Sequence, residues 1–278
     1  MDWILIVVFG LIVGFSMGLT GGGGSIFAIP ALTYGLGLGS HEAVGVSLAS
    51  VGTTALLGAV QRLWRKEVEV PTGLLFAGMG MLGAPVGTWL NGFFPEQLLL
   101  VAFATLMVAI SVLMWRRAAG PPADAAPIIE PGDVPVDQSG ASCRRDPQGR
   151  LRITSRCGLM LSGLGFGTGI LSGLFGVGGG FVIVPALVLF AGLGIRRAVA
   201  TSLLIMALIS VSGVTSYILA QRPLNLSLAA VFASMAICGL LLGTQFGRRL
   251  SGPRLQRVFS VAILLIAAFM LTQHFLAG

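Results

Sequence analysis

The chain has 278 residues, of which 55% are hydrophobic and only 10% are charged, and its mean hydropathy is +0.94. Soluble domains carry about 25% charged residues, so this composition excludes a globular enzyme with a solvated surface. At roughly 20 apolar residues per crossing, the apolar stretches predict about eight to ten membrane spans. The net charge of +7 does not indicate a nucleic-acid partner, because the basic residues stand in short clusters between apolar stretches.

Ten apolar segments are expected, five on each side of a polar stretch. The first five cover residues 2–20, 25–39, 43–61, 71–92 and 96–115, and the second five cover 158–176, 181–194, 198–220, 226–247 and 255–277. The first segment begins with an acidic residue and lacks a small-residue cleavage site, so we expect it to be retained rather than removed as a signal peptide. The stretch 116–157 has few large apolar residues, which predicts a disordered loop.

The two sides of this loop are copies of each other. Residues Gly14–Leu48 align without a gap on Gly169–Leu203, and 16 of the 35 aligned positions are identical. Further along the chain, GAPVGTWL echoes GLLLGTQF. We therefore expect a first membrane repeat over residues 1–115 and a second over 158–278.

Charge indicates how the repeats are oriented. The loop after the third segment carries Arg62, Arg65 and Lys66, whereas its counterpart, QRPLN, carries only Arg222. Such alternation is typical of inverted-topology repeats, which need an odd number of crossings per half. With 116–157 in the cytoplasm, 16 of the 17 basic residues lie inside, as the positive-inside rule requires, and both termini lie outside. Parallel repeats, the alternative, would put four arginines of the second half on the wrong side.

Each repeat opens with an apolar helix that runs into a glycine cluster. The next segment has only 14 or 15 residues, which at about 1.5 Å per residue is shorter than the hydrocarbon core of about 30 Å. Either the first two segments form a re-entrant hairpin, or the second crosses as a short helix that starts inside the membrane. Free N–H groups at such a helix start form an anion site without a charged side chain. The candidate substrate-binding glycines are Gly21, Gly22, Gly23, Gly24, Gly176, Gly178, Gly179 and Gly180.

Hydroxyl side chains accompany the clusters and can donate to an oxyanion without carrying a charge. The candidates are Ser25, Ser47, Thr201 and Ser202. The alternative for each hydroxyl is a hydrogen bond to a carbonyl of its own preceding turn. For glycines the alternative is close helix packing, which we favour for Gly14 and Gly18, four residues apart in one helix.

Charged residues are missing from the interior of every predicted segment. Intramembrane carboxylates mark proton relays and cation sites, so their absence argues against a carboxylate-lined cation transporter. The three cysteines show no disulfide or metal-ligand spacing, and no metal site is expected. His41 and Glu42 fall in a predicted loop, where we expect them to be solvated.

The motif GLTGGGGS with its following proline is repeated as GLFGVGGGF, and the two copies are followed by AVGVSL and AVATSL. With these motifs the sequence resembles the TauE/SafE family of membrane permeases, over both repeats and so nearly the whole chain outside the central loop. The resemblance implies a bacterial inner-membrane exporter of small sulfur oxyanions, such as sulfite or the organosulfonate sulfoacetate. It does not choose among these anions.

Together these features predict an all-α integral membrane protein of two inverted-topology repeats, each with about five segments and one Gly-rich interrupted or re-entrant segment. We expect it to export a small sulfur oxyanion by alternating access around a midplane site. No cofactor and no catalytic residue is implied. The expected partners are the small anionic substrate and the lipid bilayer, without nucleic acid, and the chain could form a homo-oligomer.

Two other classes of protein compete with this interpretation. An intramembrane hydrolase with Ser25 as nucleophile would need a base within hydrogen-bond reach, and the two histidines lie in a loop and near the end of the sequence. A membrane sensor or assembly subunit without transport would need a partner-binding region, for which the 116–157 loop is the candidate.

Overall fold

The computed structural model describes residues 3–118, 144–145, 151–152, 155–175, 179–221 and 225–247, and single positions 261, 264, 265 and 268. In this part of the chain the regular structure is helical apart from one antiparallel pair of two-residue strands, β1 (Arg144–Arg145) and β2 (Leu151–Arg152). The α-helices are α1 (Trp3–Thr20), α2 (Ala28–Pro30), α3 (Ser40–Trp64), α4 (Val70–Asn91), α5 (Glu96–Ala118), α6 (Ser155–Phe175), α7 (Gly180–Leu189), α8 (Ile195–Leu219) and α9 (Leu226–Gly247). A 3₁₀ helix, η1 (Gly23–Phe27), and a π-helical turn, η2 (Ala31–Gly35), flank α2.

Six described helices are long and apolar enough to cross a bilayer, namely α1, α3, α4, α6, α8 and α9. The prediction of an all-α integral membrane protein is therefore confirmed. Helices α5 and α6 run three residues into each side of the predicted central loop. Residues 119–143 and 146–150 of that loop, and nearly all of the predicted tenth segment, lie outside the described residues.

Two expectations are wrong. The prediction of a loop at His41 and Glu42 is wrong, because the helices exceed the predicted segments and α3 takes both residues into its first turn and Arg62 into its last. Charged groups are tolerated at such helix ends because long side chains reach the membrane interface. In addition, Cys157 near the start of α6 is disulfide-bonded; cysteine spacing alone does not reveal such pairing.

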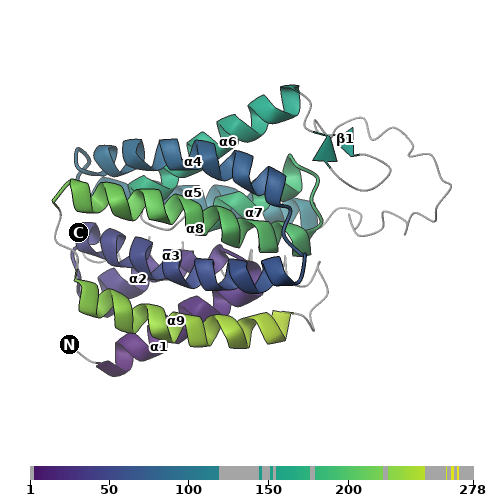
Figure 1. Ribbon diagram of the computed structural model, residues 1–278. Coiled ribbons are helices and arrows are strands. Elements are labelled where there is room, and N and C mark those ends of the chain that lie inside the picture. Colours follow the sequence, from purple (N-terminus) through teal and green to yellow (C-terminus); the bar gives the residue numbers. More distant parts are fainter. Residues whose placement is uncertain are drawn as a thin grey trace.

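The helices form a stack in the order α6, α4, α8, α3, α9, α1, with α3 and α8 in the middle (Figure 1). Burial agrees with this order. In α3 and in α8, 67% of the most apolar stretch of the helix is buried, against 39–44% in the other four spanning helices. The two central helices run antiparallel. A Cβ on Gly45 would lie 2.6 Å from the Tyr217 ring, and one on Gly213 would lie 3.4 Å from Leu48.

The outer helix pairs, α1 with α9 and α4 with α6, are packed backbone to backbone by glycines. A Cβ on Gly14 would lie 2.7 Å from the Cα of Ala236, and one on Gly169 would lie 2.8 Å from the Cα of Gly80. These two contacts correspond in the sequence repeat, because Gly14 aligns with Gly169. Only the absence of a side chain permits this approach, so the predicted packing role of Gly14 is confirmed.

Gly18 has the same role one turn further along α1. A Cβ there would lie 2.7 Å from the Thr244 nitrogen, and the aligned Gly173 would meet the Thr88 nitrogen at the same distance. Residue numbers rise together along both pairs, so α1 runs parallel to α9 and α4 runs parallel to α6. The two halves thus share one packing scheme.

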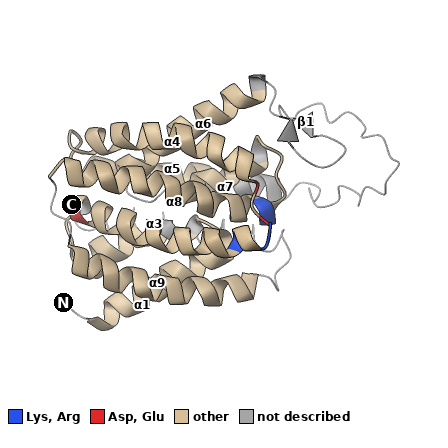
Figure 2. Ribbon diagram, viewed as in Figure 1, with Lys and Arg blue, Asp and Glu red and all other residues tan. Residues whose placement is uncertain are grey.

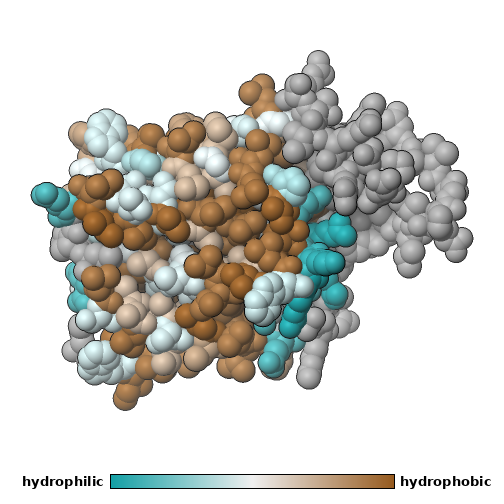
Figure 3. All heavy atoms as spheres, in the orientation of Figure 1, coloured by the Kyte–Doolittle hydropathy of each residue, from teal (hydrophilic) through white to brown (hydrophobic). Residues whose placement is uncertain are grey.

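The surface of the stack suits a bilayer. Apolar side chains cover its middle, and hydrophilic residues gather toward the two ends (Figure 3). Lys and Arg of the α3–α4 connection lie at one end, near the start of α8 (Figure 2). Because α3 and α8 are antiparallel, Glu42 at the start of α3 lies at the opposite end.

Candidate substrate site

The two glycine clusters, far apart in the sequence, meet beside the middle of α8. A Cβ on Gly22 would lie 2.8 Å from the Cα of Gly180, and one on Gly180 would lie 2.7 Å from the Cα of Gly22. The Met206 sulfur packs against both glycines, 2.9 Å from the Cβ position of Gly22. Since Met206 lies near the centre of the Ile195–Leu219 helix, the contact is deep within the helical stack.

The first cluster turns sharply at Gly21, whose φ of +76° favours glycine. The Gly21 N–H donates to the Met17 carbonyl over 2.7 Å, which closes α1. The Gly21 carbonyl accepts a 2.6 Å hydrogen bond from the Ser202 hydroxyl, which also lies 2.9 Å from the Val199 carbonyl of its own helix. The Ser202 hydroxyl therefore joins the second half of the chain to the glycine turn of the first.

After this turn the chain folds back along α1 as a hairpin. A Cβ on Gly24 would meet the backbone of Val13 and Met17, and one on Gly35 would meet the Phe9 ring. The returning arm is short and irregular, because it consists of η1, α2 and η2 in place of one α-helix. The predicted residues Gly23 and Ser25 belong to η1, and only their backbone is described.

The second cluster is followed by a regular helix. Gly179 is the N-cap of α7 with a left-handed φ of +67°, and the N–H groups of Val182 and Ile183 both bond its carbonyl over 3.0 Å. The ten residues of α7 cover about 15 Å, half of the hydrocarbon core. The predicted residues Gly176 and Gly178 lie outside the described residues.

The remaining predicted hydroxyls are buried but have different partners. Thr201 accepts a 3.0 Å hydrogen bond from the Glu69 N–H, where α4 begins. Ser47 is fully buried and its hydroxyl has no hydrogen-bond partner. Ser47 and Ser202 align in the repeat, so equivalent hydroxyls differ in their contacts.

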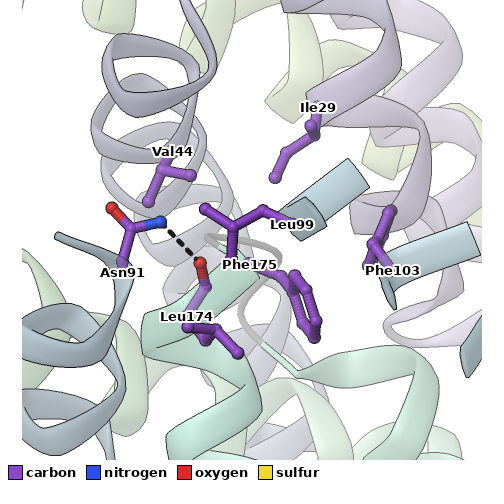
Figure 4. A pocket seen from close by; sticks show the side chains of 7 residues that line it. All are labelled: Ile29, Val44, Asn91, Leu99, Phe103, Leu174 and Phe175. Atoms are coloured by element: carbon purple, nitrogen blue, oxygen red, sulfur yellow. Dashed lines mark hydrogen bonds between the residues drawn. The ribbon is translucent and has the colours of Figure 1, made fainter. Parts of the chain in front are cut away.

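One pocket lies beside the end of α6, directly before the undescribed part of the second cluster (Figure 4). Its lining is apolar apart from the Asn91 amide: Ile29, Val44, Asn91, Leu99, Phe103, Leu174 and Phe175. Asn91 donates to the Leu174 carbonyl over 2.8 Å, and its amide oxygen lies 2.9 Å from His41 Nδ1. The role of Asn91 is not evident from the sequence, where its only signal is its place at the end of an apolar segment. His41 is exposed, as expected, but is hydrogen-bonded to Asn91.

At the opposite end of the stack, Arg62 makes the polar contacts between helices. Its guanidinium donates to the Gly18 carbonyl over 3.3 Å and lies 3.6 Å from the Glu67 carboxylate. This contact connects the end of α3 to α1 just before the first glycine turn. Polar contacts thus tie helices together on both sides of the glycine contact.

Among the described residues, no group of three His, Cys, Asp or Glu side chains could hold a metal ion.

Comparison with known proteins places this architecture in a family. The model of the family described as sulfite exporter TauE/SafE matches residues 6–270. The chain belongs to the TauE/SafE family. The match spans both glycine clusters and both helix pairs, so the resemblance seen in the motifs is confirmed.

Curated relatives match the chain over nearly their full length. A probable membrane transporter protein of Xylella fastidiosa (strain Temecula1) is 33% identical, with 94% of this chain and 92% of the relative covered. The probable membrane transporter protein YdhB of Bacillus subtilis is 28% identical, with 87% and 89% covered. MJ0441 of Methanocaldococcus jannaschii, another probable membrane transporter protein, is 25% identical, with 96% and 94% covered. No solved structure matches the chain.

The family membership decides between the classes that the sequence left open. The protein is a multi-pass membrane transporter and not an enzyme. An intramembrane hydrolase built on Ser25 is therefore set aside.

Proposed function

We propose that the protein exports a small sulfur-containing oxyanion, sulfite or an organosulfonate such as sulfoacetate, by alternating access around its glycine turns. The observation that carries this proposal is the contact between Gly22 and Gly180 beside the centre of α8. Paired Gly-interrupted segments in matching positions of two repeats are typical of transporter substrate sites. The name of the family, sulfite exporter, supports the substrate class.

Inverted-topology repeats are part of the proposal. The antiparallel packing of α3 against α8, which align with each other in the repeat, supports this orientation. The two parallel pairs, α1–α9 and α4–α6, support it further, because exchange of the halves converts one pair into the other. An axis in the membrane plane relates such halves, and rocking of one half against the other exposes the site to each side in turn.

The chemistry around the turns suits an anion. Among the described residues, no Asp, Glu, Lys or Arg is buried, and the buried polar side chains are Ser, Thr and Asn. Backbone N–H groups and hydroxyls donate to an oxyanion without a fixed countercharge, which lets the anion leave again. An anion leaving the cell would gain about 2.3 kcal/mol per charge for each 100 mV of membrane potential, so the potential can drive export.

We also propose the inner membrane of a bacterium as the location, with the central loop in the cytoplasm and both termini in the periplasm. The cluster Arg62, Arg65 and Lys66 then lies inside, as the positive-inside rule requires. Single-cysteine probes check this, with Ser139 and Gly252 labelled from the cytoplasm and Asn225 from outside. The disulfide at Cys157, next to the central loop, opposes this placement, since disulfides persist in oxidising compartments, so labelling at Ser139 decides the side of the loop. Labelling of positions 225 and 252 from one side would contradict inverted repeats.

Flux measurements test the transport function. Purified protein in proteoliposomes is expected to move sulfite or sulfoacetate under a membrane potential, with sulfate and thiosulfate as comparison anions. Protein-free liposomes provide the control. If none of the four anions crosses under a potential or a pH gradient, the proposed function is wrong.

A further inference from the structure

The two glycine turns lead into helices of different kinds. The first leads into η1, a 3₁₀ helix of five residues, whereas the second leads into α7, a regular α-helix of ten residues. A regular helix presents unpaired N–H groups and a partial positive charge at its first turn. In α7 the N–H groups of Val182 and Ile183 bond the Gly179 carbonyl, which leaves those of Gly180 and Phe181 as the donors of the first turn.

A buried hydroxyl lies next to this helix start. A Cβ on Gly179 would lie 3.4 Å from the Cβ of Ser172 and 3.1 Å from the Thr168 carbonyl, so the face of α6 that carries Ser172 is turned toward the N-cap. Ser172 is fully buried and its hydroxyl has no hydrogen-bond partner. A buried hydroxyl without a partner is unfavourable. An oxyanion at the helix start would accept its hydrogen bond.

The first turn lacks both the regular α-helix and the hydroxyl at the position of Ser172. Met17 aligns with Ser172 in the repeat and offers a thioether, which has no hydrogen to donate. Met17 is fully buried, and its backbone and side chain fill the space beside Gly24, the residue that aligns with Gly179. At Gly179 the nearest neighbours of a Cβ stand 3.1–3.7 Å away. Gly179 is therefore less tightly packed than Gly24, and a buried hydroxyl without a partner stands beside it at Ser172.

We propose that the transported oxyanion binds at the start of α7, where the Ser172 hydroxyl and the N–H groups of Gly180 and Phe181 donate hydrogen bonds to it. This inference rests on the proposed function and deepens it, because it assigns the binding group to one repeat. A pyramidal or tetrahedral sulfur oxyanion has several oxygens that can accept from these donors at once. The first turn then acts as the packed surface against which the second turn moves.

Substitutions at Ser172 test the assignment. Ser172→Ala is expected to weaken sulfite binding and raise the KM for sulfite flux by roughly 10- to 100-fold, the usual effect of losing one hydrogen bond to a charged group. The maximal flux and the thermal stability without sulfite should stay near those of the wild type. Ser172→Thr keeps the hydroxyl and should retain binding, whereas Ser172→Val, which has the same shape as Thr, should lose it.

Ser210→Ala provides the matched control. Ser210 is buried like Ser172 and also has no partner, but it packs against Gly52 on α3, so its replacement should leave sulfite affinity unchanged. If wild type transports sulfite and Ser172→Ala and Ser172→Val bind it normally, the assignment to Ser172 is wrong while the transport function stands. If the wild type neither binds nor transports sulfite or sulfoacetate, the proposed function itself fails, and the assignment fails with it.

Discussion

The two halves of the chain agree in their outer helix pairs but differ at their glycine turns, although both features are built from repeated glycines. Gly14 and Gly169 make equivalent backbone contacts in α1–α9 and α4–α6. The turns are followed by a five-residue 3₁₀ helix in one half and a ten-residue α-helix in the other. The aligned glycines therefore make the same contacts in the outer helix pairs of the two halves, whereas the residues that follow the turns form helices of different kinds.

The largest loss of folded protein is expected for substitutions in the outer helix pairs, α1–α9 and α4–α6. Gly14→Val and Gly169→Val each place a branched side chain where another helix backbone lies, and neither helix can move away without parting from its partner. Both variants should lose most of their folded yield, to a similar degree, in size-exclusion profiles of solubilised protein. Gly78→Val in α4 is the control, because nothing lies within 4 Å of its Cβ position. A normal yield for one of the two variants would show that the halves are not packed alike.

A smaller and unequal effect is expected at the aligned serines. Ser202→Ala removes the hydrogen bond to the Gly21 carbonyl and should lower the free energy of unfolding by about 0.5–1.5 kcal/mol. Ser47→Ala removes a hydroxyl without a partner and should leave stability unchanged or slightly raised. Thermal unfolding of both variants in one detergent measures the difference. Equal losses would remove this distinction between the halves.

Much of the scaffold could be predicted from the sequence, because apolar segment length and repeat alignment are properties of the chain itself. The segment predicted at 226–247 coincides with α9, and the packing role assigned to Gly14 and Gly18 is confirmed. The charged residues at helix ends could not be placed from the sequence, since helices extend beyond their apolar cores into the interface. Glu42 and Arg62 are examples.

The arrangement at the centre could not be predicted, because it depends on how the chain folds back at each turn and on contacts between the two halves, such as that of Gly22 with Gly180. Nothing in the local pattern distinguishes Gly24, which packs directly against the backbone of Val13 and Met17, from Gly179, whose neighbours are less close. The roles of Met206, which packs against both turns, and of the unpartnered Ser172 depend on how α6 and α8 meet the turns. Their sequence positions carry no motif.

The most direct measurement of the central claim is sulfite flux through Gly22→Ala in proteoliposomes. A Cβ at Gly22 would lie within 2.9 Å of Gly180 and Met206, whereas the control Gly78→Ala meets nothing within 4 Å. If substrate passes where the turns meet, Gly22→Ala should insert and fold but transport sulfite at least about tenfold more slowly, a barrier change of about 1.4 kcal/mol. Gly78→Ala should match the wild type. Wild-type flux through folded Gly22→Ala would contradict the account and move the substrate path away from the glycine turns.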